Sequence, residues 1–178
     1  MAWLFLERRT NLAHSEELKM LHFAPEPVLQ KRFRAVKSLR YISADLADPQ
    51  AVLRADITRI PCADETFHLA FCSHVLEHVA DDRAAMRELR RVIAVGGWLI
   101  CQVPIAEKPT FEDPSISDPK ERLRLFGQSD HVRIYGPDVA DRLSDAGFDV
   151  AHVTARDIAS PYETERYGIA DESLFFCS

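Results

Sequence analysis

Short apolar runs alternate along the chain with segments whose apolar residues recur at helical spacing. The runs Leu18–Phe23, Tyr41–Ala44, Val52–Ala55, Phe67–Cys72 and Trp98–Val103 are predicted as strands. Parallel strands that are joined by crossover helices produce this alternation. The pattern therefore predicts an α/β fold, a doubly wound, Rossmann-like and mostly parallel sheet with helices on both faces.

The helical segments differ in how clearly their ends are marked. Asp81–Ile93 begins at a carboxylate, places its apolar residues three and four apart and carries arginines near its end, which suits the helix dipole. Val28–Ser38 and Asp138–Ala146 are predicted as further helices. After the last of them, Phe148–Thr154 and Leu174–Cys177 read as two more strands.

The segment 105–136 is rich in proline and charge and is expected to be irregular. A connection of this length is too long for a plain loop, so we expect it to form a functional cap on the acceptor side of the site. No internal repeat and no linker divides the sequence. A single domain spanning residues 1–178 is therefore expected.

Charge and composition narrow the class of protein. The 22 Lys and Arg residues against 28 Asp and Glu residues give a net charge of −6, which argues against a nucleic-acid partner or an anionic membrane. No apolar run approaches the roughly 20 residues that cross a bilayer. The four cysteines form no CxxC pair and no export signal precedes them, so reduced thiols and a cytoplasmic location are expected.

Glycine is absent from the first half of the chain. Of the six glycines, the first is Gly96. This excludes a P-loop and the GxGxxG fingerprint of dinucleotide-binding dehydrogenases. Any ligand loop in the amino-terminal half must work without glycine.

Polar residues follow the predicted strands where each one ends. In a doubly wound sheet these carboxyl ends form the ligand site. Asp45 lies 23 residues after His22, a spacing that suits a carboxylate binding both hydroxyls of a ribose, although aspartate is also common as a cap of tight turns. Asp56 carries the same two interpretations, as an acceptor from an adenine amino group or as the end of a strand.

The stretch Ala55–Pro104 carries a resemblance to a known family. Its sequence is ADITRIPCADETFHLAFCSHVLEHVADDRAAMRELRRVIAVGGWLICQVP, in which an acid and an Ile-Pro pair precede a strand, an LEH triplet, an acidic helix ending in RV, and a GG turn. It resembles the central pattern of class I S-adenosylmethionine-dependent methyltransferases of type 11. Leu21–Glu26 (LHFAPE) and Phe126–Gly136 resemble a subset of that family.

The resemblance implies a fold, a cofactor and a set of site residues. It implies a seven-stranded sheet in the order 3-2-1-4-5-7-6, with the last strand antiparallel, and S-adenosyl-L-methionine as cofactor. The resemblance places Asp45 at the ribose, Asp56 and Ile57 at the adenine, and Ser73 and His74 beside the sulfonium. The other implied cofactor-binding residues are Leu46 and the first-loop residues His22, Phe23, Ala24, Pro25 and Glu26.

The first loop departs from the family pattern, which has an acid followed by glycines. Here the positions read His22, Phe23, Ala24, Pro25 and Glu26. A side chain narrows the approach of the cofactor to the backbone, and proline removes an N–H donor. We expect Glu26 to bind the methionine ammonium in place of the usual acid. The loop leaves open an alternative function, a catalytically degenerate methyltransferase-like binding module.

Histidines in the second half of the chain suggest two kinds of chemistry. His131, beside Asp130 in the cap, is the candidate general base for an acceptor that must lose a proton, or else a structural histidine. His74 to His78 spells H-x-x-E-H, a zinc-protease signature on a helix, but here it directly follows a strand and overlaps the LEH triplet, so no metal is expected. The expected acceptor is a small molecule. A sugar is favoured because the subset occurs alongside carbohydrate-modifying enzymes.

Overall fold

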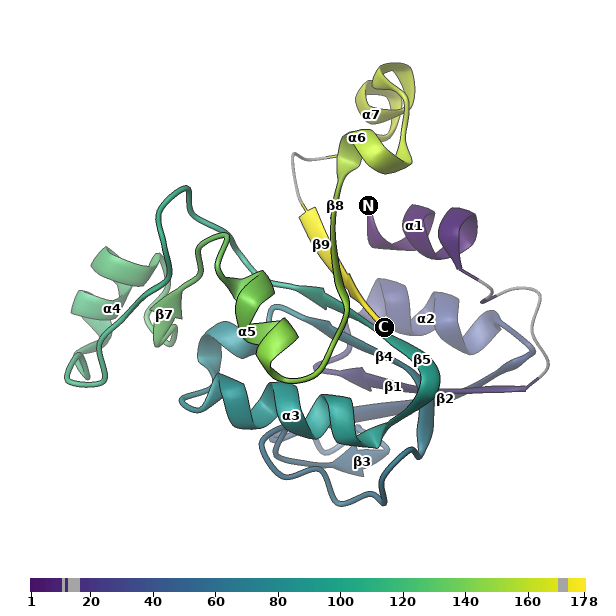
Figure 1. Cartoon of the computed structure of the whole chain (residues 1–178), viewed down its shortest axis with the longest axis horizontal. Coiled ribbons are helices and arrows are strands. Elements are labelled where there is room, and N and C mark those ends of the chain that lie inside the picture. The colour runs from purple at the N-terminus through teal and green to yellow at the C-terminus, as the bar shows by residue number, and fades with distance from the viewer. Residues whose placement is uncertain (11, 13–16, 170–172) are drawn as a thin grey trace.

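A seven-stranded sheet in the order β3-β2-β1-β4-β5-β9-β8 forms the centre of the molecule (Figure 1). The computed structural model describes residues 1–10, 12, 17–169 and 173–178. The strands of this sheet are β1 (Leu18–Phe23), β2 (Leu39–Asp45), β3 (Leu53–Arg54), β4 (Phe67–Ser73), β5 (Ile93–Gln102), β8 (Val150–Thr154) and β9 (Ser173–Cys177).

The order and directions of the strands confirm the predicted topology. When the strands of this sheet are numbered consecutively along the chain, the order is 3-2-1-4-5-7-6. The strands β1 to β5 pair in parallel, whereas β9 is antiparallel to both of its neighbours, β5 and β8. The carboxyl ends of β1 to β5 therefore meet at one edge, which is where ligands bind in such sheets.

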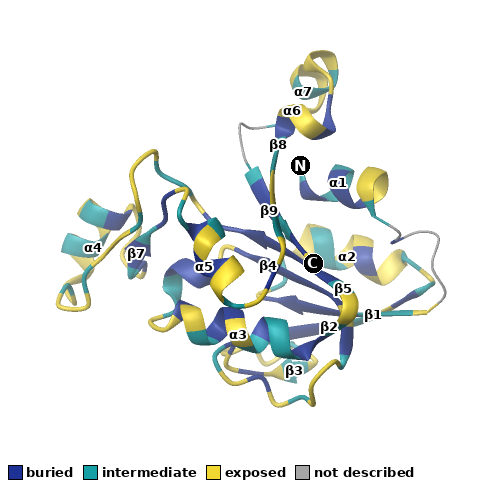
Figure 2. Cartoon of the chain, in the orientation of Figure 1, coloured by how far each residue is buried: buried dark blue, intermediate teal, exposed yellow. Residues whose placement is uncertain are grey.

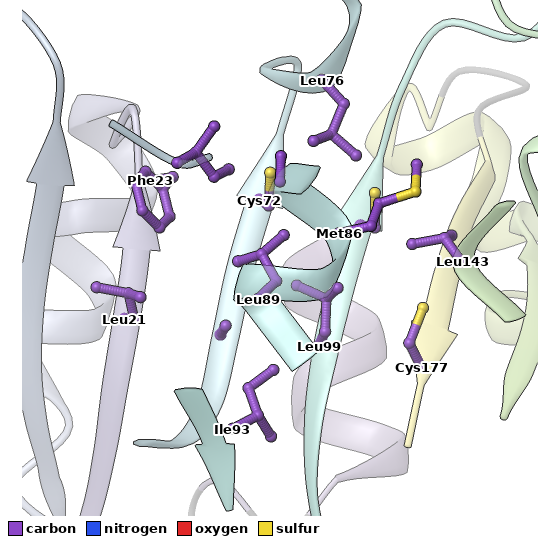
Figure 3. Close-up of a cluster of buried hydrophobic side chains, with 14 of the residues drawn as sticks. Leu21, Phe23, Cys72, Leu76, Met86, Leu89, Ile93, Leu99, Leu143 and Cys177 are labelled. Carbon is purple, nitrogen blue, oxygen red and sulfur yellow. The ribbon is translucent and has the colours of Figure 1, made fainter. Parts of the chain in front are cut away.

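Helices cover both faces of the sheet, as predicted. Their bounds are α1 (Ala2–Arg9), α2 (Pro27–Ala35), α3 (Asp82–Val92), α4 (Pro119–Phe126), α5 (Val139–Asp145), α6 (Ala155–Ile158) and α7 (Pro161–Tyr167). Buried side chains of α3 and α5 share one hydrophobic cluster with the sheet (Figure 3), and those of α1 and α2 share a second cluster on the other face. The strands between the two layers are largely buried (Figure 2).

Strand β4 shows why these runs fold as central strands. Ala70 and Cys72 belong to the cluster with α3, whereas Leu69 and Phe71 belong to the cluster with α2. Successive side chains of a strand point to opposite faces, so a strand covered on both sides has apolar residues at nearly every position. This is the reason for the continuous apolar run that predicted it.

The GG pair lies inside a strand, which corrects the expectation that it forms a turn before Trp98. Strand β5 already begins at Ile93, and its register against β4 shifts between Phe67 and Leu69. The shift marks a bulge at residues 94–97, where Gly96 has a φ of +77°. A β-carbon on Gly97 would lie 2.4 Å from the His68 carbonyl oxygen, so the close approach of the two strands requires glycine there.

The segment 105–136 is not irregular throughout, contrary to expectation. It contains α4 and the short strand β6 (Phe111–Glu112), which pairs with β7 (Arg133–Ile134). Asp118 caps the start of α4 through its side chain, Pro119 occupies the first turn, and Gly127 ends the helix in the left-handed conformation. In Figure 1, α4 and β7 lie beyond the carboxyl ends of the parallel strands.

The first and last helices were not predicted. Helix α1 contacts α6, and the guanidinium of Arg8 bonds the Ile158 carbonyl oxygen at 2.7 Å and the Glu163 carboxylate at 2.6 Å. No helix in the described part of the chain is both long and apolar enough to cross a lipid bilayer. All four cysteines are free thiols, and the three that lie in apolar runs are buried, as the sequence predicts.

Candidate functional site

A cavity of about 630 Å³ opens at the carboxyl ends of β1, β2, β3 and β4. Its volume falls within the range of roughly 300–1,000 Å³ that is usual for small-molecule sites. It lies where the sequence predicted a nucleoside. Seven of the residues expected to bind the cofactor contribute to its wall, namely Phe23, Ala24, Asp45, Leu46, Asp56, Ile57 and His74.

Asp45, at the end of β2, caps a turn and also faces the cavity. Its Oδ1 accepts hydrogen bonds from the backbone N–H groups of Ala47 at 2.7 Å and Asp48 at 2.8 Å. Asp45 is half-buried and lines the cavity. Both interpretations of this residue from sequence are therefore compatible, because the turn uses one carboxylate oxygen and holds the side chain in a fixed position.

Asp56, which follows the edge strand β3, likewise caps a turn and lines the cavity. Its Oδ1 accepts from the Thr58 backbone N–H at 2.9 Å and from the Thr58 hydroxyl at 2.8 Å. The side chain is exposed to the cavity, and the neighbouring Ile57 is buried beneath it. The two aspartates thus follow neighbouring strands and both line an open cavity, which the protein's own side chains leave unfilled.

The first loop replaces glycine by strained backbone and a buried histidine. Ala24 has a φ of +46°, in the left-handed region that favours glycine. His22 is fully buried at the end of β1, with its Nδ1 3.0 Å from the Tyr41 hydroxyl and its Nε2 3.0 Å from Glu26 Oε2. His22 therefore supports Glu26 rather than lining the cavity. Pro25 lines neither this cavity nor the neighbouring one.

A second cavity of about 340 Å³ shares one lining residue, His74, with the first. Glu26, Ser73 and Gln102 contribute to its wall, from the ends of β1, β4 and β5. Burial raises the pKa of Glu26, but its hydrogen bond with His22 and a backbone hydrogen bond outweigh that effect, so the net pKa is lowered. Glu26 is therefore a carboxylate at neutral pH and suits a cationic group.

The expected base His131 lies behind the wall of the larger cavity. Its ring is buried, and its centroid lies 4.7 Å from that of His78, which does line the cavity. Asp130 contacts His78 rather than His131, with its Oδ2 3.3 Å from His78 Nδ1. The structure therefore brings both cap residues into contact with His78, which lines the cavity and which the sequence indicated only as part of the H-x-x-E-H motif.

A buried ionic network joins the cap to the start of α3. The guanidinium of Arg133 bonds the Leu76 carbonyl oxygen at 2.9 Å, the Ala80 carbonyl oxygen at 2.8 Å and the Glu112 carboxylate at 2.8 Å, and it also bonds the Val79 carbonyl oxygen. These bonds fix the turn after β4 against the cap.

Asp82 is the second carboxylate of this network, and its sequence position indicates only the start of a helix. Its Oδ2 accepts from the Tyr135 hydroxyl at 2.7 Å and from the Arg142 guanidinium at 2.9 Å. Burial, followed by the charge on Asp82, raises the pKa of Tyr135, so the phenol stays protonated and donates. Only the fold reveals this cluster, because its members come from separate segments of the chain.

Part of the chain matches a known protein family. Residues 20–101 match the sequence profile of the family described as a methyltransferase domain. A curated relative, an uncharacterized 37.1 kDa protein of transposon TN4556 from Streptomyces fradiae, is 31% identical over 99 residues, which are 55% of this chain and 29% of that protein. The chain thus spans less than a third of the length of this relative.

Solved structures share the fold over nearly the whole chain. A chain from the complex of the Haloferax volcanii Trm112 methyltransferase activator with a methyltransferase has a TM-score of 0.65, 16% identity and coverage of 99% of this chain and 95% of its own. A Burkholderia thailandensis 1,6-didemethyltoxoflavin-N1-methyltransferase with bound S-adenosylhomocysteine has a TM-score of 0.62 and 11% identity, and the match covers 99% of this chain and 73% of that one. The [4+2]-cyclase SpnF has a TM-score of 0.62 and 15% identity, and the match covers 98% of this chain and 78% of that one. At these identities the likeness establishes the fold alone.

Proposed function

We propose that this chain, whose residues 20–101 match the methyltransferase-domain family, transfers a methyl group from S-adenosyl-L-methionine to a small-molecule acceptor. The observation that carries the proposal is the cavity of about 630 Å³ between Asp45 and Asp56, at the edge of the sheet where such folds bind ligands. A sugar is the favoured acceptor class, on the resemblance of Leu21–Glu26 and Phe126–Gly136 alone.

The nucleoside half of the cofactor is assigned to the larger cavity. The ribose hydroxyls would donate to Asp45 at Oδ2, because the turn already uses Oδ1. The adenine would lie between Leu46 and Ile57, with its amino group donating to Asp56. Charge-assisted hydrogen bonds of this kind are stronger than neutral ones, so each aspartate would contribute substantially to affinity.

The methionine half is assigned to the adjoining cavity. Glu26 would bind the ammonium group, and its carboxylate is held in place by His22. Ser73 and His74, which both line this cavity, would flank the sulfonium. An extended cofactor would thus pass Asp56 after β3, Asp45 at the end of β2, Ser73 at the end of β4 and Glu26 after β1.

The chain's own residues contribute mainly by positioning. When bound, the cofactor supplies an electrophilic methyl group to an acceptor atom that attacks in line with the sulfur. Holding two reactants in line supplies effective molarities of order 10⁵ M or more, so little covalent help is required from side chains. The acceptor would approach from the cap, past His78. His131 remains the sequence-predicted base for an acceptor that must lose a proton.

Calorimetric titration with S-adenosylmethionine and S-adenosylhomocysteine tests the assignment. We expect micromolar binding by the parent protein and at least tenfold weaker binding by Asp45→Ala and Asp56→Ala. Asp145→Ala serves as the matched control, because this aspartate is exposed on α5, pairs with Arg83 and lines neither cavity.

Two results would contradict the proposal. Absence of binding at millimolar cofactor would favour the degenerate binding module that the glycine-free loop leaves open. Equal affinities for the parent and both cavity variants would show that the cofactor binds elsewhere. Turnover is then tested by mass spectrometry, as a gain of about 14 Da on members of a sugar and small-metabolite panel.

A further inference from the structure

Three metal-ligating side chains converge where the turn after β4 meets the cap. Glu77 and His78 belong to the short 3-10 helix η1 (Leu76–His78), and His131 belongs to the cap just before β7. One nitrogen or oxygen atom from each of the three lies within 4.8 Å of the others. Neither the methyltransferase match nor the proposed function accounts for this arrangement.

Glu77 is the observation that points to a ligand. The residue is only 2% exposed. Its Oε1 lies 3.3 Å from His74 Nδ1, but its Oε2 is buried and makes no hydrogen bond with the described residues. Burying a carboxylate oxygen without a partner is costly, and proteins compensate by pairing it with a charge or a metal ion. The side chain is thus held next to two imidazoles with one oxygen unused.

Each histidine ring has a polar partner at Nδ1, as metal ligands usually have. His131 Nδ1 lies 3.1 Å from the Phe126 carbonyl oxygen, which can only accept, so this nitrogen carries the proton and the Nε2 lone pair is available. His78 Nδ1 lies 3.3 Å from the Asp130 carboxylate, an ion-pair contact.

The backbone around the three ligands is rigid. The Val132 N–H donates to the Glu77 carbonyl oxygen at 2.9 Å, directly linking the segment that carries His131 to the helix that carries the other two ligands. Arg133 bonds the carbonyl oxygens of Leu76 and Ala80 on either side of that helix. The ligands are therefore positioned by the fold before any ion binds, which lowers the cost of assembling a site.

We propose that Glu77, His78 and His131 bind a divalent transition-metal ion, such as Zn²⁺ or Fe²⁺. Two imidazole nitrogens and one carboxylate suit these ions, whereas Mg²⁺ and Ca²⁺ prefer oxygen ligands alone. Bonds of about 2.1 Å place the ligands of a tetrahedral ion roughly 3.4 Å apart. The separations of up to 4.8 Å therefore need shifts well below 2 Å, within the reach of side-chain rotation.

The ligand set differs from the H-x-x-E-H signature that the sequence analysis set aside. Of that motif, the cluster contains Glu77 and His78 only, and the third ligand comes from the cap, 53 residues beyond His78. The expectation of no metal rests on the motif directly following a strand and overlapping the LEH triplet. A distant histidine cannot be included from sequence, because only the fold brings His131 to the turn.

The site stands against the wall of the larger cavity, which His78 lines. An ion there has an open coordination position, since three protein ligands leave room for water or for an acceptor oxygen. On the proposed function, such an ion would bind the acceptor and promote loss of its proton to solvent. His131 would then act as a ligand rather than as the free base.

Metal titration of the purified chain tests the proposal. After dialysis against EDTA and removal of the chelator, titration with Zn²⁺ is expected to show one equivalent bound at micromolar or tighter affinity. Glu77→Gln and His131→Ala should each weaken binding at least 100-fold. His152→Ala is the control, because His152 is exposed on β8 and lies outside the cluster. Its affinity should equal that of the parent.

A spectroscopic probe separates loss of the site from loss of the fold. Co²⁺ bound by two nitrogens and an oxygen gives visible d–d absorption, which is expected for the parent and His152→Ala but not for Glu77→Gln, a variant of nearly unchanged shape. Circular dichroism should be the same for all of them. Stoichiometric binding that survives both ligand substitutions, no binding by the parent, or displacement of Zn²⁺ by equimolar Mg²⁺ would each overturn the proposal.

The outcome is independent of methyl transfer. Zn²⁺ binding without cofactor binding would leave the metal site standing and refute the proposed function. Cofactor binding with no metal bound would do the reverse.

Discussion

Glu26 shows at the scale of single residues how a departure from the family pattern is accommodated. The sequence indicated that this carboxylate stands in for the usual acid, but not what supports it. The support is the buried ring of His22, which bonds Glu26 at one nitrogen and the Tyr41 hydroxyl at the other. A partner at this distance in sequence cannot be read from the pattern, because Tyr41 comes from the neighbouring strand.

Cofactor binding should persist in acid until Glu26 is protonated. Because the net pKa of Glu26 is lowered from the ordinary value of about 4.3, the carboxylate keeps its charge through the usual glutamate range. Its contribution is therefore fully present above that range and is lost as the pH falls through the lowered pKa. Calorimetry from pH 7 to pH 5 should show no loss of affinity from protonation of Glu26 in the parent.

Removing the charge of Glu26 supplies the comparison. Glu26→Gln should bind S-adenosylmethionine about tenfold or more weakly at pH 7, in line with about 1.5–3 kcal/mol for a hydrogen bond to a charged group. A variant with parental affinity would remove Glu26 from the proposed site.

Ala24 carries backbone strain that glycine would relieve. With a φ of +46°, the residue sits in a conformation that costs a non-glycine residue roughly 1–2 kcal/mol. Glycine also adds freedom to the unfolded chain, which offsets about 0.4–1 kcal/mol of the gain. Ala24→Gly should therefore raise the free energy of unfolding by up to about 1 kcal/mol in urea titrations.

The same substitution bears on cofactor affinity. Since Ala24 lines the larger cavity, Ala24→Gly should bind the cofactor at least as tightly as the parent. Clear destabilisation together with weaker binding would mean that the methyl group packs usefully and that the strain is small.

At the scale of elements, the apolar runs predicted all seven strands of the central sheet. Strands β1, β2, β4, β5 and β9 contain buried residues, whereas β3 and β8, at the two edges of the sheet, are only partly buried. The bulge in β5 escaped prediction, since a GG pair is equally typical of a turn and of a close approach between strands. Helices α1, α6 and α7 also escaped, as they are short and depend on contacts such as that between Arg8 and Glu163. The local sequence pattern predicts a short helix poorly when tertiary contacts provide most of its stability.

The two glycines of the bulge should differ sharply in their tolerance of alanine. At Gly97 a β-carbon would lie 2.4 Å from the His68 carbonyl oxygen, so the strands must separate and Gly97→Ala should cost about 2–3 kcal/mol of stability. At Gly96 nothing lies within 4 Å of the added carbon, and only the φ of +77° opposes it, for about 1 kcal/mol. Urea denaturation of both variants measures the difference, and equal losses would argue against the bulge.

At the scale of the whole molecule, the sheet was predictable and the docking of the cap was not. The strand ends that form the cavity follow from the topology, so Asp45 and Asp56 could be placed together from sequence. The cluster of Asp82, Arg133 and Arg142 joins α3 to segments 50 or more residues later in the chain. No periodicity links such residues, so the position of His131 beside His78 could not be foreseen either.

Arg133 should therefore control both stability and the metal site. Its guanidinium is buried against Asp82, Glu112 and three backbone carbonyl oxygens. Breaking a buried pair by removing one partner leaves the other charge uncompensated, typically at a cost of about 3–5 kcal/mol. We expect Arg133→Met, which keeps the volume of the side chain, to lose about that much free energy of unfolding in urea.

Zn²⁺ affinity tests whether Arg133 positions the metal ligands in addition to stabilising the fold. Because Arg133 fixes the turn that carries Glu77 and His78, Arg133→Met should also weaken Zn²⁺ binding, although this residue is no ligand. Tyr135→Phe is the matched control. It removes the hydroxyl contacts with Asp82 at 2.7 Å and with the Leu76 carbonyl oxygen at 3.4 Å, and should cost about 1–2 kcal/mol, but the stronger bonds from Arg133 still anchor the turn. If Arg133→Met were destabilised but bound Zn²⁺ as tightly as Tyr135→Phe, the turn would hold its ligands without the cap network. The preorganisation of the site would then rest on the bond from Val132 to Glu77 alone.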